Sequence, residues 1–237
     1  MRILCVIPVR GGSKGLPRKN ALEIVDGVSL LEWTVRQALD CYPVEDIVVS
    51  TEDDELARIA ESCGVAVVKR PPELAQDSTT TAAVVDHLLG VFDPEAIRFD
   101  AVAILQVTSP LREPDDIRRS IEMMNSGAYD SVVSAYMTTT CHPAKLYFLE
   151  DTMEVLVARP VAPEHEFARR QDLPQAYRRN GAIFLVTRDH YARTGRLWGG
   201  RTGLVVMPEN HSVDIDTAAD LKRAREILTR LNTEARP

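Results

Sequence analysis

The chain has 237 residues, of which 45% are hydrophobic and 27% are charged, a composition that suits one large domain with at most a small appendage. Its formal net charge of -7 argues against non-specific binding to nucleic acid, which needs a basic surface. No apolar run approaches the length of a membrane span, and the first one stops at Arg10 and Gly11 without a signal-peptide pattern. We therefore expect a cytoplasmic protein with no membrane partner.

The chain opens with an apolar, β-branched run from Ile3 to Val9, which predicts a buried strand. Glycines follow at positions 11, 12 and 15, and such a loop can turn sharply and point its N–H groups at an anion. Four cations lie on or beside it: Arg10, Lys14, Arg18 and Lys19. The loop therefore predicts a cradle for a polyphosphate, although its spacing matches neither a Walker A loop nor a dinucleotide fingerprint. On spacing alone, a flexible glycine turn with solvated charges is the alternative.

Predicted helices and strands then alternate. Helices are expected from an N-cap at Ser29 to about residue 38 and over 53–63, 79–91 and 114–125, and strands over 46–50, 65–68, 100–107 and 131–135. This alternation predicts an α/β fold with a mainly parallel sheet and helices on both faces. Ligands bind at the carboxyl ends of such strands, so the glycine loop and Gln106 are expected on one rim. A polar side chain at the end of a buried strand needs a partner, and a ligand rich in hydroxyls would supply one.

Residues 137–179 break the alternation, with prolines at 143, 160, 163 and 174. We interpret them as an excursion from the main sheet in the form of a hairpin or arm. Regular strands are expected again over 181–186 and 203–207, and an amphipathic helix over about 217–231.

Two groups of charged residues near the end of the chain could carry chemistry. Asp214 and Asp216 fall on one side of an extended segment, and two carboxylates suit Mg²⁺ when phosphate oxygens and waters complete its shell. Asp216 could instead cap the last helix. Four arginines flank the irregular segment: Arg169, Arg170, Arg178 and Arg179. Solvation explains any one of them by default, but arginine is also the preferred fork for a carboxylate or phosphate.

Five blocks of sequence, in order, resemble those of the acylneuraminate cytidylyltransferases, the CMP-sialic acid synthetases. The blocks are IPVRGGSKGLPRKN at 7–20, RPPELAQDST at 70–79, LQVTSPLR at 105–112, RRQDLPQAYRRNGAIF at 169–184 and SVDIDT at 212–217. The resemblance runs from end to end and is far more specific than the glycine motif alone. It implies a single domain, 1–237, with a Rossmann-like nucleotidyltransferase fold that uses CTP and Mg²⁺. The arm, at about 140–170, would protrude and exchange between the subunits of a homodimer.

The resemblance also implies roles for individual residues. The triphosphate would be held by Arg10, Gly11, Gly12, Ser13, Lys14, Lys19 and Asn20, and the cytidine by Arg70, Thr79 and Thr81. The sugar acid would lie near Gln106, Arg170, Arg178 and Asn180, with an N-acyl pocket at Phe184, Leu197 and Trp198. Asp214 and Asp216 would be the metal ligands, and Arg10, Lys19 and Asp216 the catalytic residues. The Leu197-Trp198 pair departs from the aromatic pair of some family members, which leaves the acyl preference open.

The implied reaction transfers CMP from CTP to the anomeric hydroxyl of a nonulosonic, sialic-type sugar acid and releases pyrophosphate. Two alternatives remain open. One is the same transfer to another acid, namely legionaminate, pseudaminate, 3-deoxy-octulosonate or a phosphonate. The other is a non-enzymatic nucleotide-binding protein, against which the joint presence of Lys19, Gln106, Asp214 and Asp216 argues. The general base is left open.

Overall fold

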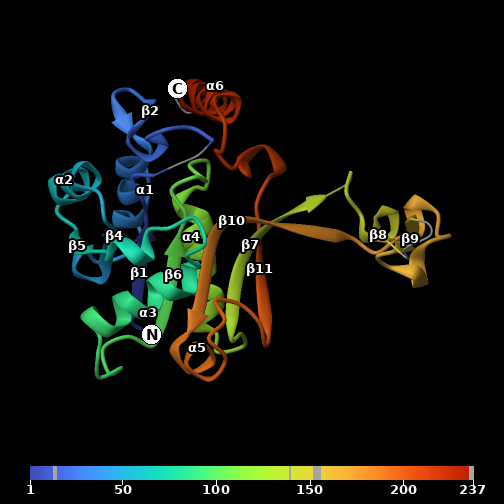
Figure 1. The fold of residues 1–237 in the computed structure, drawn as a ribbon, viewed down its shortest axis with the longest axis horizontal. Helices are drawn as coiled ribbons and strands as arrows, with labels where there is room; N and C mark the ends of the chain where they lie inside the picture. The colour runs from blue at the N-terminus through green and yellow to red at the C-terminus, as the bar shows by residue number, and fades with distance from the viewer. Residues whose placement is uncertain (13–14, 139, 152–155, 235–237) are drawn as a thin grey trace.

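A seven-stranded sheet forms the centre of the molecule in the computed structural model, which describes residues 1–12, 15–138, 140–151 and 156–234 (Figure 1). The strands lie in the order β11-β7-β10-β6-β1-β4-β5. All neighbours in this order are parallel except for β10, which runs antiparallel to both β6 and β7. The predicted α/β fold with a mainly parallel sheet is confirmed.

The sheet strands are β1 (Ile3–Pro8), β4 (Ile47–Thr51), β5 (Ala66–Lys69), β6 (Ala101–Leu105), β7 (Ser131–Thr138), β10 (Ala176–Thr187) and β11 (Thr202–Val206). The helices are α1 (Leu30–Leu39), α2 (Asp54–Ser62), α3 (Thr81–Phe92), α4 (Pro114–Asn125), α5 (Arg188–Thr194) and α6 (Ala218–Glu234). Two small antiparallel pairs lie outside the main sheet, β2 (Glu23–Val25) with β3 (Val28–Ser29), and β8 (Tyr147–Asp151) with β9 (Leu156–Pro160).

Helices cover both faces of the sheet. Alternate residues of β1 point to opposite faces, so that Cys5 and Ile7 pack into one buried cluster and Leu4 and Val6 into the other. The first cluster takes buried side chains from α1, α2, α4 and α6, and the second from α3 and α5. The core of the protein is therefore the central sheet packed between two layers of helices.

Local capping explains where several helices begin. The Ser29 hydroxyl accepts a hydrogen bond of 3.2 Å from the N–H of Glu32, as the predicted N-cap requires. Asp53 accepts from the N–H groups of Glu55 and Leu56 at the start of α2, each at 3.0 Å. Pro114 stands in the first turn of α4, where its missing N–H costs nothing.

Three elements differ from the sequence prediction. The strand expected over 181–186 is longer, because β10 begins at Ala176 and crosses a bulge between Arg179 and Phe184. Its added residues are mostly polar and exposed, so they show no apolar alternation. Helix α5 and the β2–β3 hairpin were not predicted. Both are short, and a few residues give little periodic signal.

The strands β7 and β10 continue out of the body as a two-stranded ribbon that carries β8 and β9 at its far end (Figure 1). The expected arm is therefore present as a projection. Large apolar side chains cover its surface, including Phe148 at 58% exposed, Leu149 at 67% and Phe167 at 92%. Within the described ranges, no helix combines the length and the apolar character needed to cross a membrane.

Candidate active site

The glycine loop follows β1 and contacts two other segments of the chain. On one side the N–H of Gly11 donates a hydrogen bond of 2.8 Å to the side chain of Glu52, which lies just before α2. On the other side Gly15 lies against the backbone of Asp216, so close that a Cβ on Gly15 would stand 2.5 Å from that carbonyl oxygen. The absence of a side chain at Gly15 therefore permits this contact between the first and last parts of the chain. Ser13 and Lys14 lie outside the described residues.

Lys19 joins the loop to the far end of the chain. Its Nζ donates to the carbonyl oxygen of Ile215 at 2.8 Å and to Oδ1 of Asp216 at 2.9 Å. The Lys19 side chain is only 12% exposed, so this ion pair is partly shielded from water. The glycine loop and the paired aspartates thus meet, which fits the triphosphate and metal roles that the family resemblance implies for them.

The segment that carries the aspartates is extended. Val213 and Ile215 are buried in the core, whereas Asp214 and Asp216 point outward between them. The N–H of Ile215 donates to the carbonyl oxygen of Thr108 at 2.8 Å, which fixes this segment beside the end of β6.

The start of α6 tests whether Asp216 is a helix cap. The capping hydrogen bonds there come from Thr217 and Asp220: the Thr217 N–H donates to Asp220 at 2.8 Å, and the Asp220 N–H donates to the Thr217 hydroxyl at 3.3 Å. The carboxylate of Asp216 is engaged by Lys19 instead. The capping interpretation of Asp216 is therefore wrong.

The two aspartates form an anionic pair. Burial raises the pKa of Asp214, a hydrogen bond with the Thr108 side chain works in the opposite direction, and the neighbouring Asp216 carboxylate raises the pKa further. Repulsion of this kind is relieved when a cation binds between the carboxylates. Among the described residues no group of three or more His, Cys, Asp or Glu could hold a metal alone. A Mg²⁺ ion that shares this pair with phosphate oxygens and waters would still suit the donor set.

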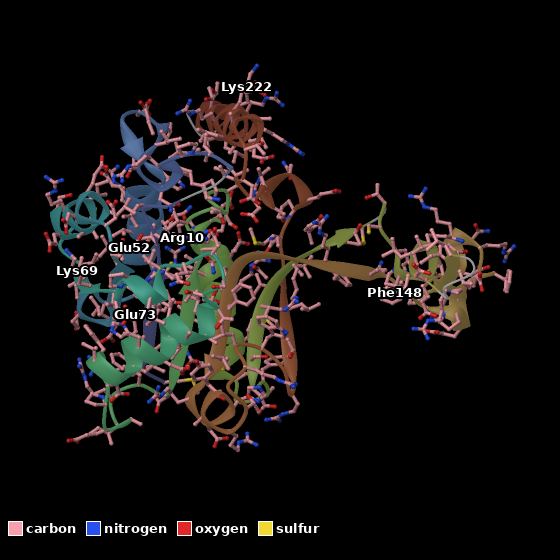
Figure 2. The ribbon with its side chains drawn as sticks, viewed as in Figure 1. Arg10, Glu52, Lys69, Glu73, Phe148 and Lys222 are labelled. Carbon is pink, nitrogen blue, oxygen red and sulfur yellow. The ribbon has the colours of Figure 1, made fainter. Side chains whose placement is uncertain are left out.

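A pocket of about 540 Å³ opens between the glycine loop, the start of α3 and the end of β6. We call it the cation-rich pocket, because Arg10, Lys19 and Arg70 line it. Arg10 pairs with Asp77 at 2.7 Å across this pocket. In Figure 2, Arg10 lies in the body of the molecule near Glu52, far from Phe148 on the arm. The other predicted residues that line the pocket are Gly12, Asn20, Thr79, Thr81, Gln106 and Asp216.

Two of these predicted ligand residues are largely engaged by the protein itself. Arg70 is buried, and its guanidinium donates to the carbonyl oxygens of Val9 at 2.8 Å and Ser50 at 2.7 Å. It therefore fixes the ends of β1 and β4 where they meet the pocket. Asn20 donates to the Arg10 carbonyl at 2.9 Å, and its buried Oδ1 has no hydrogen-bond partner in the described part of the chain.

Two further pockets adjoin the first. The apolar pocket, of about 650 Å³, is lined by Ala82, Phe184, Leu197 and Trp198 and shares Thr81 and Gln106 with the cation-rich pocket. The arginine pocket, of about 640 Å³, is lined by Tyr136, Arg178, Arg179, Asn180, Asp214 and Arg223. It shares Phe184 and Trp198 with the apolar pocket and Asp216 with the cation-rich pocket. The three pockets are therefore neighbours that share lining residues.

Of the four residues predicted near a sugar acid, Arg178 lines the arginine pocket, and the other three differ in their surroundings. The Gln106 side chain makes no hydrogen bond within the described ranges, so its amide is available at the junction of two pockets. Asn180 is used internally, because it donates to Ser212 at 2.9 Å and accepts from Ser134 at 2.5 Å. Arg170 lies on the arm, in the short turn Arg170–Asp172, and lines none of the three pockets.

Sequence reasoning did not assign several lining residues to the site. Asp77 and Thr108 lie inside blocks that carried the resemblance, and their polar side chains next to predicted site residues were the available signal. Tyr136 and Arg223 come from β7 and α6, and no local pattern marked them. Arg179 was noticed only as one of four arginines.

A family model described as cytidylyltransferase matches residues 4–232. The chain belongs to that family. The N-acylneuraminate cytidylyltransferase of Streptococcus agalactiae serotype V is 34% identical over 222 residues, which are 93% of this chain and 52% of that relative. This cytidylyltransferase therefore spans about half the length of that relative.

Two further comparisons cover nearly the whole length of both chains. The pseudaminic acid cytidylyltransferase of Campylobacter jejuni is 29% identical over 237 residues, which are 99% of each chain. A solved structure of CMP:2-keto-3-deoxy-manno-octonic acid synthetase complexed with CTP matches with a TM-score of 0.70 at 19% identity, covering 98% of this chain and 100% of that one. That likeness supports the cytidylyltransferase fold.

Proposed function

We propose that this cytidylyltransferase transfers CMP from CTP to the anomeric hydroxyl of a nonulosonic, sialic-type sugar acid and releases pyrophosphate. The observation that carries the proposal is the Lys19–Asp216 contact of 2.9 Å, which closes the cation-rich pocket between the glycine loop and the aspartate segment. A pocket for a polyphosphate alone would not need the adjoining apolar and arginine pockets. An acid with a charged end and an N-acyl group would fill them.

In the proposed reaction the anomeric oxygen forms a new bond to the α-phosphorus of CTP. The bond from that phosphorus to the oxygen bridging to the β-phosphate breaks, pyrophosphate leaves, and the sugar hydroxyl loses its proton. Positioning and charge neutralisation supply most of the rate in such transfers. Arg10 and Lys19 would offset the charge that gathers on the phosphates, with the loop N–H group of Gly12 beside them, whereas the N–H of Gly11 is engaged by Glu52. Thr79 and Thr81 line the same pocket and are the proposed contacts of the cytidine.

Mg²⁺ is the proposed cofactor, and Asp214 and Asp216 would hold it. When bound, it would neutralise phosphate charge and orient the phosphate oxygens. Burial is the main cause that raises the pKa of Asp214, and the Asp216 carboxylate raises it further; a cation bound between the two carboxylates would relieve that second contribution. Lys19 would keep the Asp216 carboxylate turned toward the cation-rich pocket.

The acceptor would place its N-acyl group in the apolar pocket, against Phe184, Leu197 and Trp198, and its carboxylate toward Arg178. Gln106, at the junction of the pockets, would hydrogen-bond the sugar. The full-length likeness to a pseudaminic acid cytidylyltransferase supports pseudaminate as a second candidate acceptor.

A homodimer is the proposed assembly, and the cytoplasm, where CTP is available, is its proposed compartment. The exposed apolar side chains of the arm support contact with a second copy of the chain. Arg170 lines none of the three pockets of its own subunit, so on the arm it would serve the site of the partner subunit.

A substrate panel tests the proposed function. The purified protein is incubated with CTP, MgCl₂ and one candidate acid at a time, namely N-acetylneuraminate, legionaminate, pseudaminate or 3-deoxy-octulosonate, and pyrophosphate release is recorded. We expect release with a nonulosonic acid and none without an acceptor. Binding of CTP without release in the presence of every acid would favour a non-enzymatic nucleotide-binding protein.

A further inference from the structure

The ring of Trp198 separates the apolar pocket from the arginine pocket. Trp198 and Phe184 line both pockets, and their ring centroids lie 5.5 Å apart with 36° between the planes. Trp198 is nevertheless 42% exposed, and its indole N–H makes no hydrogen bond within the described part of the chain. Contacts on the faces and edges of the ring must therefore hold it in place.

The guanidinium of Arg179 supplies the closest of these contacts. Its central carbon lies 4.1 Å from the centroid of the Trp198 ring, well within the range of a cation–π interaction. Arg179 lines the arginine pocket but not the apolar pocket, and it forms no ion pair with a carboxylate among the described residues. The indole ring is thus the principal partner of this cation.

The backbone explains why Trp198 needs such a contact. Trp198 lies in the loop between α5 and β11, where Gly195, Gly199 and Gly200 all have positive φ, so no regular element fixes its position. Arg179 and Phe184 both belong to β10 and flank its bulge. The strand therefore offers a support for the Trp198 ring, while Ser131 fixes the backbone of the neighbouring Gly199 through hydrogen bonds of 2.9 and 3.1 Å.

We propose that Arg179 is a positioning residue that acts through Trp198. It holds the indole ring in place between the apolar pocket and the arginine pocket. The ring thereby limits the size of the N-acyl group that the apolar pocket accepts. This inference rests on the proposed function, because it concerns the selectivity of the same site. Without the cation the ring would move toward the arginine pocket, and longer acyl chains would enter.

The test compares Arg179→Met with wild type on nonulosonic acids that differ only in an N-acetyl or N-butanoyl group. We expect the preference for the acetyl compound in kcat/KM to fall about fivefold, which is the order of one exposed cation–π contact. The KM for CTP should stay unchanged, and Arg179→Lys should give an intermediate preference because it keeps the charge but not the planar fork. Arg193→Met on α5 is the matched control for loss of one arginine.

Fluorescence provides a readout that does not depend on turnover. The chain has two tryptophans, so a Trp33→Phe background reports Trp198 alone. There, Arg179→Met should raise the quenching of Trp198 by acrylamide about twofold, as expected for a ring released from a stacked cation. In a Trp198→Phe background, Arg179→Met should leave the acyl preference unchanged, since the two residues act as one unit.

Three results would overturn the inference: an unchanged acyl preference in Arg179→Met, unchanged quenching, or a rise in the KM for CTP equal to that for the acid. If the wild-type protein turns over no sugar acid, the proposed function fails and the acyl-size role falls with it. The quenching measurement would still decide whether Arg179 holds Trp198, so the two failures are distinguishable.

Discussion

Lys19 makes the contact on which the proposed chemistry depends. Its loss should lower the rate of the reaction more than the stability of the fold. We expect Lys19→Ala to lower kcat/KM for pyrophosphate release roughly 10²- to 10³-fold, the usual cost of removing one preorganised charge donor. Lys222→Ala is the matched control, because Lys222 is an exposed lysine on α6 (Figure 2). Thermal melts of both variants separate a catalytic loss from unfolding. Near-normal release by Lys19→Ala would contradict the assignment of the loop.

Asp53 should make stability depend on pH in acid. The hydrogen bond from Arg18, at 2.7 Å, lowers the pKa of the Asp53 carboxyl, with a further contribution from the N–H of Leu56. A lowered pKa contributes stability that is present above the unfolded value, about 3.9, and is lost as the pH falls through the folded value. Asp53→Asn, which keeps a capping side chain, should therefore be less stable than wild type at pH 7 and equal to it below both pKa values.

Denaturant unfolding between pH 3 and pH 7 measures this difference, with Asp189→Asn as the control for loss of a surface carboxylate. Asp53→Ala should lose the cap as well, which costs about 1 kcal/mol. A difference between wild type and Asp53→Asn that stayed constant down to pH 3 would show that the Arg18 contact does not lower the pKa of Asp53.

At the scale of elements, the approach of the glycine loop to the aspartate segment tolerates no side chain at Gly15. A Cβ there would stand 2.5 Å from a backbone oxygen of Asp216, so one of the two segments must move. We expect Gly15→Ala to cost about 1–3 kcal/mol of stability, as overpacking does, and to weaken the Lys19–Asp216 contact. Gly12→Ala is the matched control for stability, because its Cβ would meet no atom of the described residues within 4 Å. Equal unfolding midpoints for the two variants would contradict this close approach.

Arg112 shows how buried polar contacts tie the elements of the site together. It is 1% exposed, and its guanidinium donates to the carbonyl oxygens of Gln106 at 2.8 Å and Ala182 at 3.0 Å. Burial lowers the pKa of Arg112 to about 10. The end of β6 is thus joined to the bulge in the middle of β10, which holds Gln106 at the junction of the cation-rich and apolar pockets.

Elements with strong local signals could be predicted from the sequence. Helix α1 begins directly after its predicted N-cap Ser29, and α4 begins at Pro114, as predicted. Buried strands such as β6 coincide with the apolar runs in the sequence. Part of β10 could not be predicted, because residues 176–179 pair with β7 in an exposed ribbon and therefore show no alternation of buried apolar side chains. Helix α5 had only the Thr187 cap and Gly195 to mark it, and these signals are common in loops.

Some residues of the candidate site could likewise be predicted from the sequence, and others could not. Lys19 and Asp216 could be placed together because both lie in sequence blocks that carry the family resemblance. Asn180 was predicted to meet the sugar acid, yet its hydrogen bonds run to Ser134 and Ser212, which only the three-dimensional arrangement shows. The partition by Trp198 depends on a contact across 19 residues of chain and a bulge, and neither has a local sequence signal.

For the whole molecule, strand order brings the site together. Strand β1 lies between β6 and β4, so the loop after β1 and Gln106 after β6 reach the same rim from adjacent strands. The antiparallel strand β10 then brings Phe184 and the arginines to that rim and continues outward into the arm (Figure 1). One strand therefore connects the candidate site to the candidate dimer surface.

The arm should determine the assembly. We expect the wild-type chain to sediment as a dimer and the double variant Phe148→Asp, Leu149→Asp to shift toward the monomer, because it places charge on the exposed apolar surface of β8. Ile97→Asp is the matched control, since Ile97 is 77% exposed in the body of the molecule. A double variant that stays dimeric would show that the arm does not mediate the association.

Mixing two inactive variants tests whether the arm also completes the partner's site. In a Lys19→Ala and Arg170→Ala heterodimer, one site would carry both defects and the other neither, provided that Arg170 acts across the dimer. Random exchange of subunits should then restore about a quarter of wild-type activity, because half of the dimers are mixed and each has one intact site. If Arg170 acts in its own subunit, every site keeps one defect and mixing restores nothing. Recovery therefore requires both association of the two variant chains and a site shared between subunits.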